Sequence, residues 1–229
     1  MNYGLWRRYQ IVRSLVKGGC LLDVGCGTGW FLASMANRPG WRVVGIEPNT
    51  FAARYAQEQF GLDVINAFPD QLNFEEASFD VVTMWDVVEH LHNPTTILSR
   101  VRIWLKNRGF LIIRTPNLGS WDSRVFREFW AGLDLPRHLF VLDKGSLSLL
   151  LEKTGFRIIE MRTGTGSYEI FFLSLRYWLD EKVGSPRIRN ALLRVWNSTV
   201  VRLISAPLFF TLDRMGLGAE IVAIAQPES

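Results

Sequence analysis

The sequence predicts an α/β fold with a mostly parallel, doubly wound sheet. Short apolar runs, typical of strands buried on both faces, alternate along the chain with segments of helical periodicity. Glycine and proline residues separate many of these segments, and there is no internal repeat or low-complexity tract. Because parallel strands need crossover connections, this alternation indicates βαβ units.

Seven segments are predicted to be strands, with helices between most of them. The strands are 21–24, 41–46, 62–65, 79–84, 110–114, 156–161 and 220–225. The helices are 3–17, 30–35, 48–60, 94–106 and 143–154, followed by two or more helices within 168–215. Gly61 and Gly155 stand where a glycine commonly ends a helix. Residues 115–142 are predicted to be a long loop.

Composition and charge limit the possible classes of protein. The 229 residues are expected to form one domain, 1–229, in which 168–215 is an elaboration. The net charge of +4 permits an anionic partner, but Lys and Arg are spread along the chain, so nucleic acid is an unlikely partner. No secretory signal and no membrane-spanning run are expected.

The two cysteines, Cys20 and Cys26, exclude a disulfide framework. Their spacing also gives no zinc-binding pattern, so no metal site is predicted. Free thiols suit a reducing compartment, and a cytoplasmic location is therefore expected.

Three glycines, Gly25, Gly27 and Gly29, follow the strand at 21–24 directly. Glycine tolerates positive φ and lets a ligand approach the backbone, although a tight turn would need glycine too. Glu47 ends the next strand about 20 residues later, where an acidic side chain can accept hydrogen bonds from ribose hydroxyls. The spacing G-x-G-x-G puts Trp30 where a dinucleotide fingerprint has its third glycine. An adenosine-containing ligand without a pyrophosphate is therefore predicted.

Four segments resemble the successive motifs of class I S-adenosylmethionine-dependent methyltransferases. They are LLDVGCGTGWFL, VVGIEPN, SFDVVTMWDVVEHLHNP and LKNRGFLIIRTPN. The segment FWAGLDLPRHLFVLDKGSLSLLLEKTGF resembles the bacterial subgroup related to ubiquinone-biosynthesis O-methyltransferases, whose members are often linked to cell-envelope sugar or lipid pathways. The resemblance covers roughly 15–163 and 216–226. It implies a Rossmann-like seven-stranded sheet, with the last strand antiparallel between the fifth and sixth.

The resemblance also implies S-adenosylmethionine as the cofactor. Asp23 and the glycines would surround its amino-acid part, Glu47 would take the ribose hydroxyls, and Trp85 with Asp86 would line the methionine and substrate side. The full predicted cofactor site is Asp23, Gly25, Cys26, Gly27, Gly29, Glu47, Pro48, Ala67, Phe68, Trp85 and Asp86.

One position departs from the family pattern. Members commonly have an Asp near position 68, where this chain has Phe68, with Asp70 two residues later. The backbone N–H of Phe68, or stacking by its ring, would then replace a carboxylate contact to adenine.

Histidine and tryptophan side chains are the candidates for the chemistry. His138, in DLPRHLF, is predicted to be a general base or a substrate contact, and the alternative is a histidine that only holds its loop in place. His90 is predicted to have a structural role rather than to bind a metal. His92 is predicted to be a solvated cap residue. Trp85 and Trp30 could face the cationic sulfur or could simply pack in the core.

Residues 168–215 combine apolar stripes with arginines at helical spacing. A lid, a homodimer contact and a membrane-surface element, at the inner face of the membrane, all stay open.

The leading function is methyl transfer to a small-molecule acceptor, expected to be a hydroxyl of a saccharide, lipid-linked or quinone-like substrate. An RNA methyltransferase and a non-catalytic scaffold are the alternatives. The N-P-P-[YFW] motif of base amino-methylation is absent, and the fourth strand reads MWDVVEH instead. A NAD-dependent dehydrogenase is disfavoured by Trp30.

Overall fold

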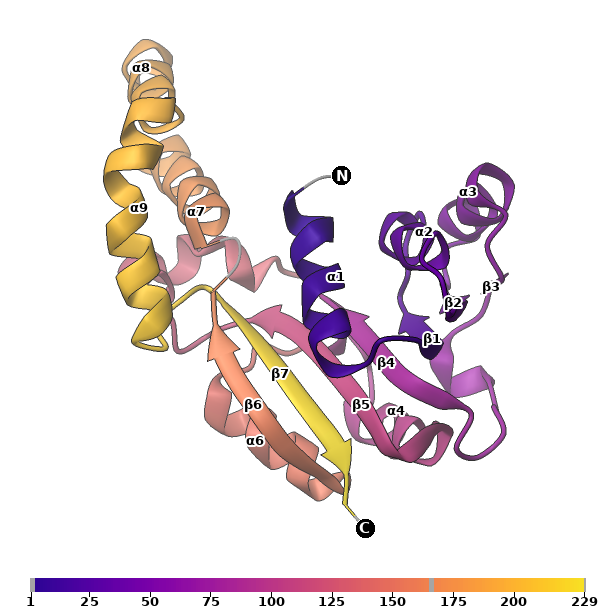
Figure 1. Cartoon of the computed structure of the whole chain (residues 1–229). Helices are drawn as coiled ribbons and strands as arrows, with labels where there is room; N and C mark the ends of the chain where they lie inside the picture. The colour runs from indigo at the N-terminus through magenta and orange to yellow at the C-terminus, as the bar shows by residue number, and fades with distance from the viewer. Residues whose placement is uncertain (1–2, 165–166, 229) are drawn as a thin grey trace. The chain divides into compact units, whose positions relative to one another are not determined.

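The computed structural model describes residues 3–164 and 167–228, and its central feature is a seven-stranded sheet (Figure 1). Its strand order is β3-β2-β1-β4-β5-β7-β6. The strands are β1 Gly19–Val24, β2 Trp41–Ile46, β3 Val64–Ile65, β4 Phe79–Trp85, β5 Leu105–Pro116, β6 Phe156–Thr163 and β7 Glu220–Pro227.

The first five strands of the chain pair in parallel, and the last strand reverses direction. Strand β7 lies between β5 and β6 (Figure 1). The N–H of Glu228 donates to the carbonyl of Gly155, and the N–H of Gly164 donates to that of Glu220, which is the antiparallel pattern. The predicted fold class is therefore confirmed, including the place of the last strand.

Nine α-helices occur in the described part of the chain, and eight of them lie between strands. They are α1 Tyr3–Leu15, α2 Trp30–Ala36, α3 Thr50–Phe60, α4 Pro94–Trp104, α5 Trp121–Phe126, α6 Lys144–Lys153, α7 Ser167–Lys182, α8 Pro186–Trp196 and α9 Thr199–Arg214. Short 3-10 helices occur at η1 Pro69–Gln71, η2 Val88–His90, η3 Arg127–Phe129 and η4 Ala131–Leu133.

The chain packs as two compact units. The first contains Met1–Arg114, Ser148–Glu160 and Ala223–Ser229, and the second contains Thr115–Leu147 and Met161–Val222. Most of the sheet belongs to the first unit. The single domain expected over 1–229 stays a prediction, and residues 1, 2, 165, 166 and 229 of it lie outside the described residues.

The core of the first unit forms where the sequence has its apolar strands. The last four residues of β1 are buried, as expected for a strand covered on both faces. Helix α3 begins where Asn49 accepts a hydrogen bond from the N–H of Ala52, and it ends at Gly61, whose φ is 63°. These two residues therefore set the length of the helix that follows β2.

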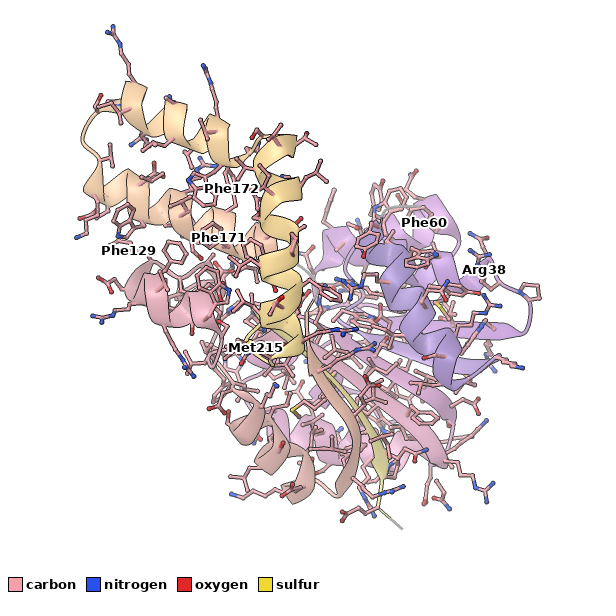
Figure 2. The ribbon with its side chains drawn as sticks, turned by 60° about the vertical axis from the view of Figure 1, so that its left-hand side comes forward. Arg38, Phe60, Phe129, Phe171, Phe172 and Met215 are labelled. Carbon is pink, nitrogen blue, oxygen red and sulfur yellow. The ribbon has the colours of Figure 1, made fainter. Side chains whose placement is uncertain are left out.

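The second unit has its own aromatic core. Phe126, Trp130, Phe171 and Phe209 are buried together, and Trp121 stacks on Phe171 with ring centroids 5.5 Å apart. Figure 2 shows Phe129 and Phe171 within this unit.

The predicted loop 115–142 is therefore not irregular throughout. Ser120 caps α5 by accepting a hydrogen bond from the N–H of Ser123, and the rings of Phe126 and Trp130 that follow are buried. The segment from Trp121 to Trp130 contributes the side chains of Trp121, Phe126, Phe129 and Trp130 to the aromatic core.

Within residues 3–164 and 167–228, no single helix is long and apolar enough to cross a membrane. Helices α8 and α9 meet the length and composition requirement only as a pair, and they are bent by 63° relative to each other.

Candidate active site

The three glycines after β1 form a turn of left-handed backbone. Their φ angles are 69°, 56° and 81° for Gly25, Gly27 and Gly29. A Cβ atom on Gly25 would lie 2.6 Å from a methyl of Val87, and one on Gly29 would lie 2.7 Å from Cβ of Ala56. Those two glycines are thus required by packing.

Gly27 differs from its neighbours because its open side faces space. No described atom outside Gly27 and its two chain neighbours lies within 4 Å of the position that its Cβ would occupy. The backbone at Gly27 is therefore accessible to a ligand, as the sequence predicts for a glycine loop that binds one.

Glu47 follows β2 and is buried against this loop. One carboxylate oxygen, Oε2, accepts the N–H of Gly27 at 2.8 Å, and the other, Oε1, accepts the N–H of Asn49 at 2.8 Å. Each carboxylate oxygen has a second acceptor site, so both can also accept a hydroxyl. The structure brings Gly27 and Glu47 together, and Glu47 itself orders the loop.

The residues predicted beside adenine lie after β2 and β3. Pro48 is exposed and Ala67 is half-buried. The amide of Asn66 donates to the carbonyls of Glu47 and Pro48 at 2.8 and 3.0 Å, and so joins the two strand ends. Asn66 was missed at the sequence level because a lone Asn after a short strand is typical of ordinary turns.

The structure modifies the prediction for Phe68. Its N–H, expected to be available for adenine, donates to Oε1 of Gln71 at 3.0 Å. Its ring is 56% exposed, so a stacking role stays compatible with the structure.

Cys26 lies in the glycine loop with its side chain buried. A Cβ on Gly45 would lie 2.7 Å from the Cys26 sulfur, so the thiol fills the space above that glycine. Burial raises the pKa of the Cys26 thiol far above its usual range. The side chain is therefore a neutral packing group, and its backbone N–H donates to Ile46 at 3.0 Å.

Asp23 lies in the buried part of β1 and accepts a hydrogen bond from the Thr83 hydroxyl at 2.6 Å. Burial raises the pKa of Asp23 to about 7, and the Thr83 hydrogen bond and the charge of Arg8 oppose that rise only partly. Near neutral pH this carboxyl consequently exchanges between its two protonation states.

Asp23 should make the stability of the protein pH-dependent. The folded state holds the proton more tightly than the unfolded state, so the stabilisation is complete below about pH 4 and is lost as the pH rises to about 7. Asp23→Asn is expected to remove this component, which amounts to at most about 4 kcal/mol. Urea denaturation across this pH range measures it, with exposed Asp70→Asn as the control. An unchanged pH slope in Asp23→Asn would contradict the assignment.

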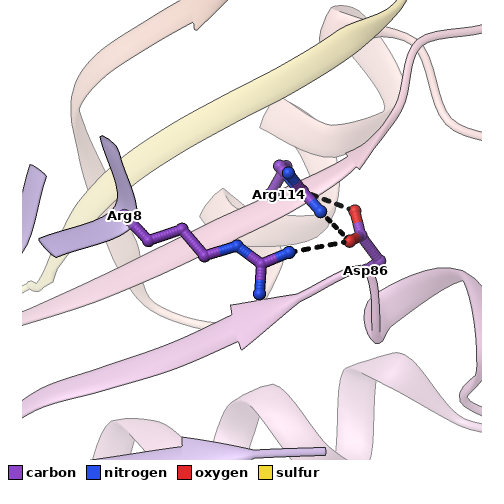
Figure 3. Close-up of polar contacts among 3 residues, drawn as sticks. All are labelled: Arg8, Asp86 and Arg114. Atoms are coloured by element: carbon purple, nitrogen blue, oxygen red, sulfur yellow. Dashed lines mark hydrogen bonds and ion pairs between the residues drawn. The ribbon is translucent and has the colours of Figure 1, made fainter. Parts of the chain in front are cut away.

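Asp86 follows β4 and is held by two arginines (Figure 3). Arg114 approaches it with two nitrogens, and its Nε lies 2.8 Å from Oδ1. Arg8 of α1 lies 3.5 Å from Oδ2 and also covers the Trp85 ring at 5.2 Å. With a φ of 59°, Asp86 has a backbone conformation that is rare for a residue with a side chain. This cluster therefore fixes the carboxylate at the strand end.

Arg8 and Arg114 were missed by the sequence-based prediction. Arg114 lies in register beside Trp85 across the parallel β4–β5 pair. A charged residue at the end of the apolar run FLIIR was the feature that could have identified it. Nothing in the basic segment around Arg8 distinguishes it from its neighbours.

The two tryptophans have different surroundings. Trp85 is buried edge-on against Phe31, and its Nε1 has no hydrogen-bond partner among the described residues. Trp30 is 55% exposed and packs on Phe60 at 4.9 Å. It lines an open pocket of about 900 Å³ with Leu5 and Arg38. Trp30 thus lies outside the core. Trp85 belongs to β4, the strand that pairs with β1, and is therefore the better placed of the two to lie near a ligand of the glycine loop.

His138 belongs to the second unit. Its Nδ1 lies 2.8 Å from the carbonyl oxygen of Gly132, which can only accept, so Nδ1 carries a proton. This bond orients the ring, and the other ring nitrogen, Nε2, lies 3.8 Å from Asp134. The geometry suits either a base or a histidine that orders its loop.

A family model described as a methyltransferase domain matches residues 7–161, about two thirds of the chain. The chain belongs to this methyltransferase domain family. The predicted membership among S-adenosylmethionine-dependent methyltransferases is confirmed, as is the predicted cofactor.

Similar proteins differ in the acceptors that their names imply. A ubiquinone biosynthesis O-methyltransferase of Cereibacter sphaeroides is 39% identical over 128 residues, covering 53% of this chain and 51% of the relative. A tRNA U34 carboxymethyltransferase of Pseudoalteromonas translucida is 26% identical over 157 residues, covering 64% and 47%. The chain spans about half the length of the curated relatives it matches.

Solved structures support the fold over nearly the whole chain. A SAM-dependent methyltransferase from Archaeoglobus fulgidus superposes with a TM-score of 0.66 at 22% identity, covering 97% of this chain and 92% of the other. At this identity the likeness establishes the fold of this methyltransferase domain and no more.

Proposed function

We propose that this methyltransferase domain transfers the methyl group of S-adenosylmethionine to a small molecule. The proposed acceptor is a hydroxyl of a saccharide, lipid-linked or quinone-like compound. The observation that carries the proposal is the open backbone of Gly27 beside the buried carboxylate of Glu47. The name of the Cereibacter sphaeroides relative supports a hydroxyl acceptor.

The residues around the glycine loop fit the chemical groups of the cofactor. Glu47 offers acceptor sites for the ribose hydroxyls, and Phe68 offers an exposed ring for stacking. The buried Trp85 donor and the fixed Asp86 carboxylate suit the polar amino-acid part. The cofactor supplies an electrophilic methyl group, and the protein supplies position and electrostatics.

Calorimetric titration with S-adenosylmethionine and S-adenosylhomocysteine tests the cofactor half of this proposal. Micromolar binding of both is expected. Transfer of a radiolabelled methyl group to glycolipid, quinone-precursor and tRNA pools then tests the acceptor half. A folded protein that binds neither cofactor form would overturn the proposal.

His138→Ala is expected to lower turnover by about 100-fold or more, because a general base contributes roughly 10²–10⁴ to such reactions. Affinity for S-adenosylmethionine should stay unchanged. The measurement is kcat against pH with the acceptor found by the screen. His92→Ala is the matched control, since His92 is exposed. Normal turnover in His138→Ala would leave this histidine the structural role of ordering its loop.

An RNA acceptor is the second candidate. The similarity to a tRNA U34 carboxymethyltransferase, which spans 157 residues, favours it. Labelling of tRNA, with no labelling of glycolipid or quinone precursors, would replace the first candidate by this one.

A further inference from the structure

We propose that α8 and α9 form a docking surface for an anionic lipid membrane. This inference is independent of the acceptor and of the cofactor site. Its starting point is a lack of burial in two regular, fully described helices. None of the residues of α8 is buried, and in α9 the only buried residue is Phe209.

Helix α9 exposes an apolar stripe on the side opposite Phe209. Val200, Leu203, Ile204 and Leu208 recur at helical spacing on this side. Leu203 and Ile204 are 70% and 75% exposed. Phe209 instead contacts Tyr168 and Phe171, with ring centroids 5.3 and 5.5 Å away. The stripe is therefore not the face by which α9 packs in its own unit.

Helix α8 also exposes an apolar stripe. Ile188, Leu192 and Val195 lie at intervals of four and three residues and are all exposed. Two exposed stripes on consecutive helices exceed the isolated apolar residues of ordinary surfaces.

The charge of the two helices indicates what covers the stripes. Within α8 and α9 there are five arginines and one aspartate. The aspartate, Asp213, is engaged internally, because its Oδ1 accepts the Ser167 hydroxyl at 2.7 Å. Of the arginines, Arg189 pairs with Asp180 at 3.0 Å. The surface therefore keeps a positive charge around its apolar stripes, which is the composition of interfacial helices on anionic lipid.

The same charges disfavour two other arrangements of these helices, a membrane span and a contact with a second copy of the chain. Three arginines in α8 and the 63° bend to α9 disfavour a membrane-spanning arrangement, because arginine is costly at the bilayer centre. A symmetric contact with a second copy would bring the arginines of both copies together. An anionic lipid surface compensates these charges, and it is therefore the inferred partner of α8 and α9.

Vesicle flotation with the full chain tests this docking. The vesicles contain phosphatidylcholine alone, or phosphatidylcholine and phosphatidylglycerol in equal parts. Binding is expected only with phosphatidylglycerol, and Arg187→Gln with Arg194→Gln should weaken it by about 25-fold, from about five-fold per arginine. Leu203→Asp with Ile204→Asp should weaken it by more than about 100-fold.

Matched variants separate docking from folding and from the cofactor site. Leu149→Asp, which is exposed on α6, and Arg13→Gln, which is exposed on α1, should leave flotation unchanged. All variants should bind S-adenosylmethionine like the parent chain. No flotation of the parent chain, or a dimer by sedimentation that Ile204→Asp dissociates, would overturn the proposal. Equal losses in the control variants would overturn it as well.

Discussion

Glu47→Ala should lower the affinity for S-adenosylmethionine at least about 100-fold, since each hydrogen bond to a charged group is worth about 1.5–3 kcal/mol. The mutation removes two kinds of contact at once. It deletes the proposed acceptors for the ribose hydroxyls, and it frees the N–H groups of Gly27 and Asn49 from their carboxylate partner. Calorimetric titration measures the loss.

Two further variants make the Glu47 result specific. Glu58→Ala changes an exposed carboxylate on α3 and should bind normally. Glu47→Gln keeps the shape of the side chain but places a donor opposite one of the two backbone N–H groups, so it should bind almost as weakly as Glu47→Ala. Parental affinity in both Glu47 variants, with the fold intact by circular dichroism, would remove Glu47 from the cofactor site.

Gly27→Ala should lower cofactor affinity by about 10- to 100-fold. The added methyl group would take space that the bound cofactor is proposed to fill, and such overpacking costs about 1–3 kcal/mol. Gly61 provides a closely matched control. Both glycines have similar positive φ, 56° and 63°, and neither has a described atom beyond its own residue and chain neighbours within 4 Å of its missing Cβ. Alanine should therefore destabilise the fold equally at the two positions, by about 1–2 kcal/mol.

The comparison of these two variants separates an effect on cofactor binding from an effect on stability. Urea denaturation should give equal losses of stability, while titration should give a loss of affinity at position 27 alone. An equal affinity in Gly27→Ala and Gly61→Ala would mean that the open side of the glycine loop does not face the cofactor.

The arrangement of the glycine loop and Glu47 could be predicted from sequence because it depends on local rules. Strand, glycine turn and acidic strand end follow in order within about 30 residues, and each has a residue type that few others can replace. Gly27 and Glu47 meet as expected because β1 and β2 pair in parallel and in register. Backbone pairing brings the ends of the two strands together, and the Glu47 side chain completes the contact with Gly27.

The arginine cluster around Asp86 could not be predicted in the same way. Arg8 and Arg114 lie far from Asp86 in sequence, and only the pairing of β4 with β5 and the packing of α1 bring them together. The hydrogen bond from Phe68 to Gln71 is local, but many polar residues could have made it. The pKa of Asp23 follows from complete burial, which one residue's identity does not reveal.

The place of β7 has a consequence for how the chain folds during synthesis. Strands β1 to β5, with Gly27 and Glu47, are complete once Pro116 has been made. Among the described strands β6 neighbours β7 alone, so it has no partner until β7 emerges. Until then the edges of β5 and β6 that face β7 expose unpaired backbone groups, the usual starting points of aggregation. The glycine loop can thus be assembled early, while a chain stalled before residue 220 would depend on chaperones to shield those strands.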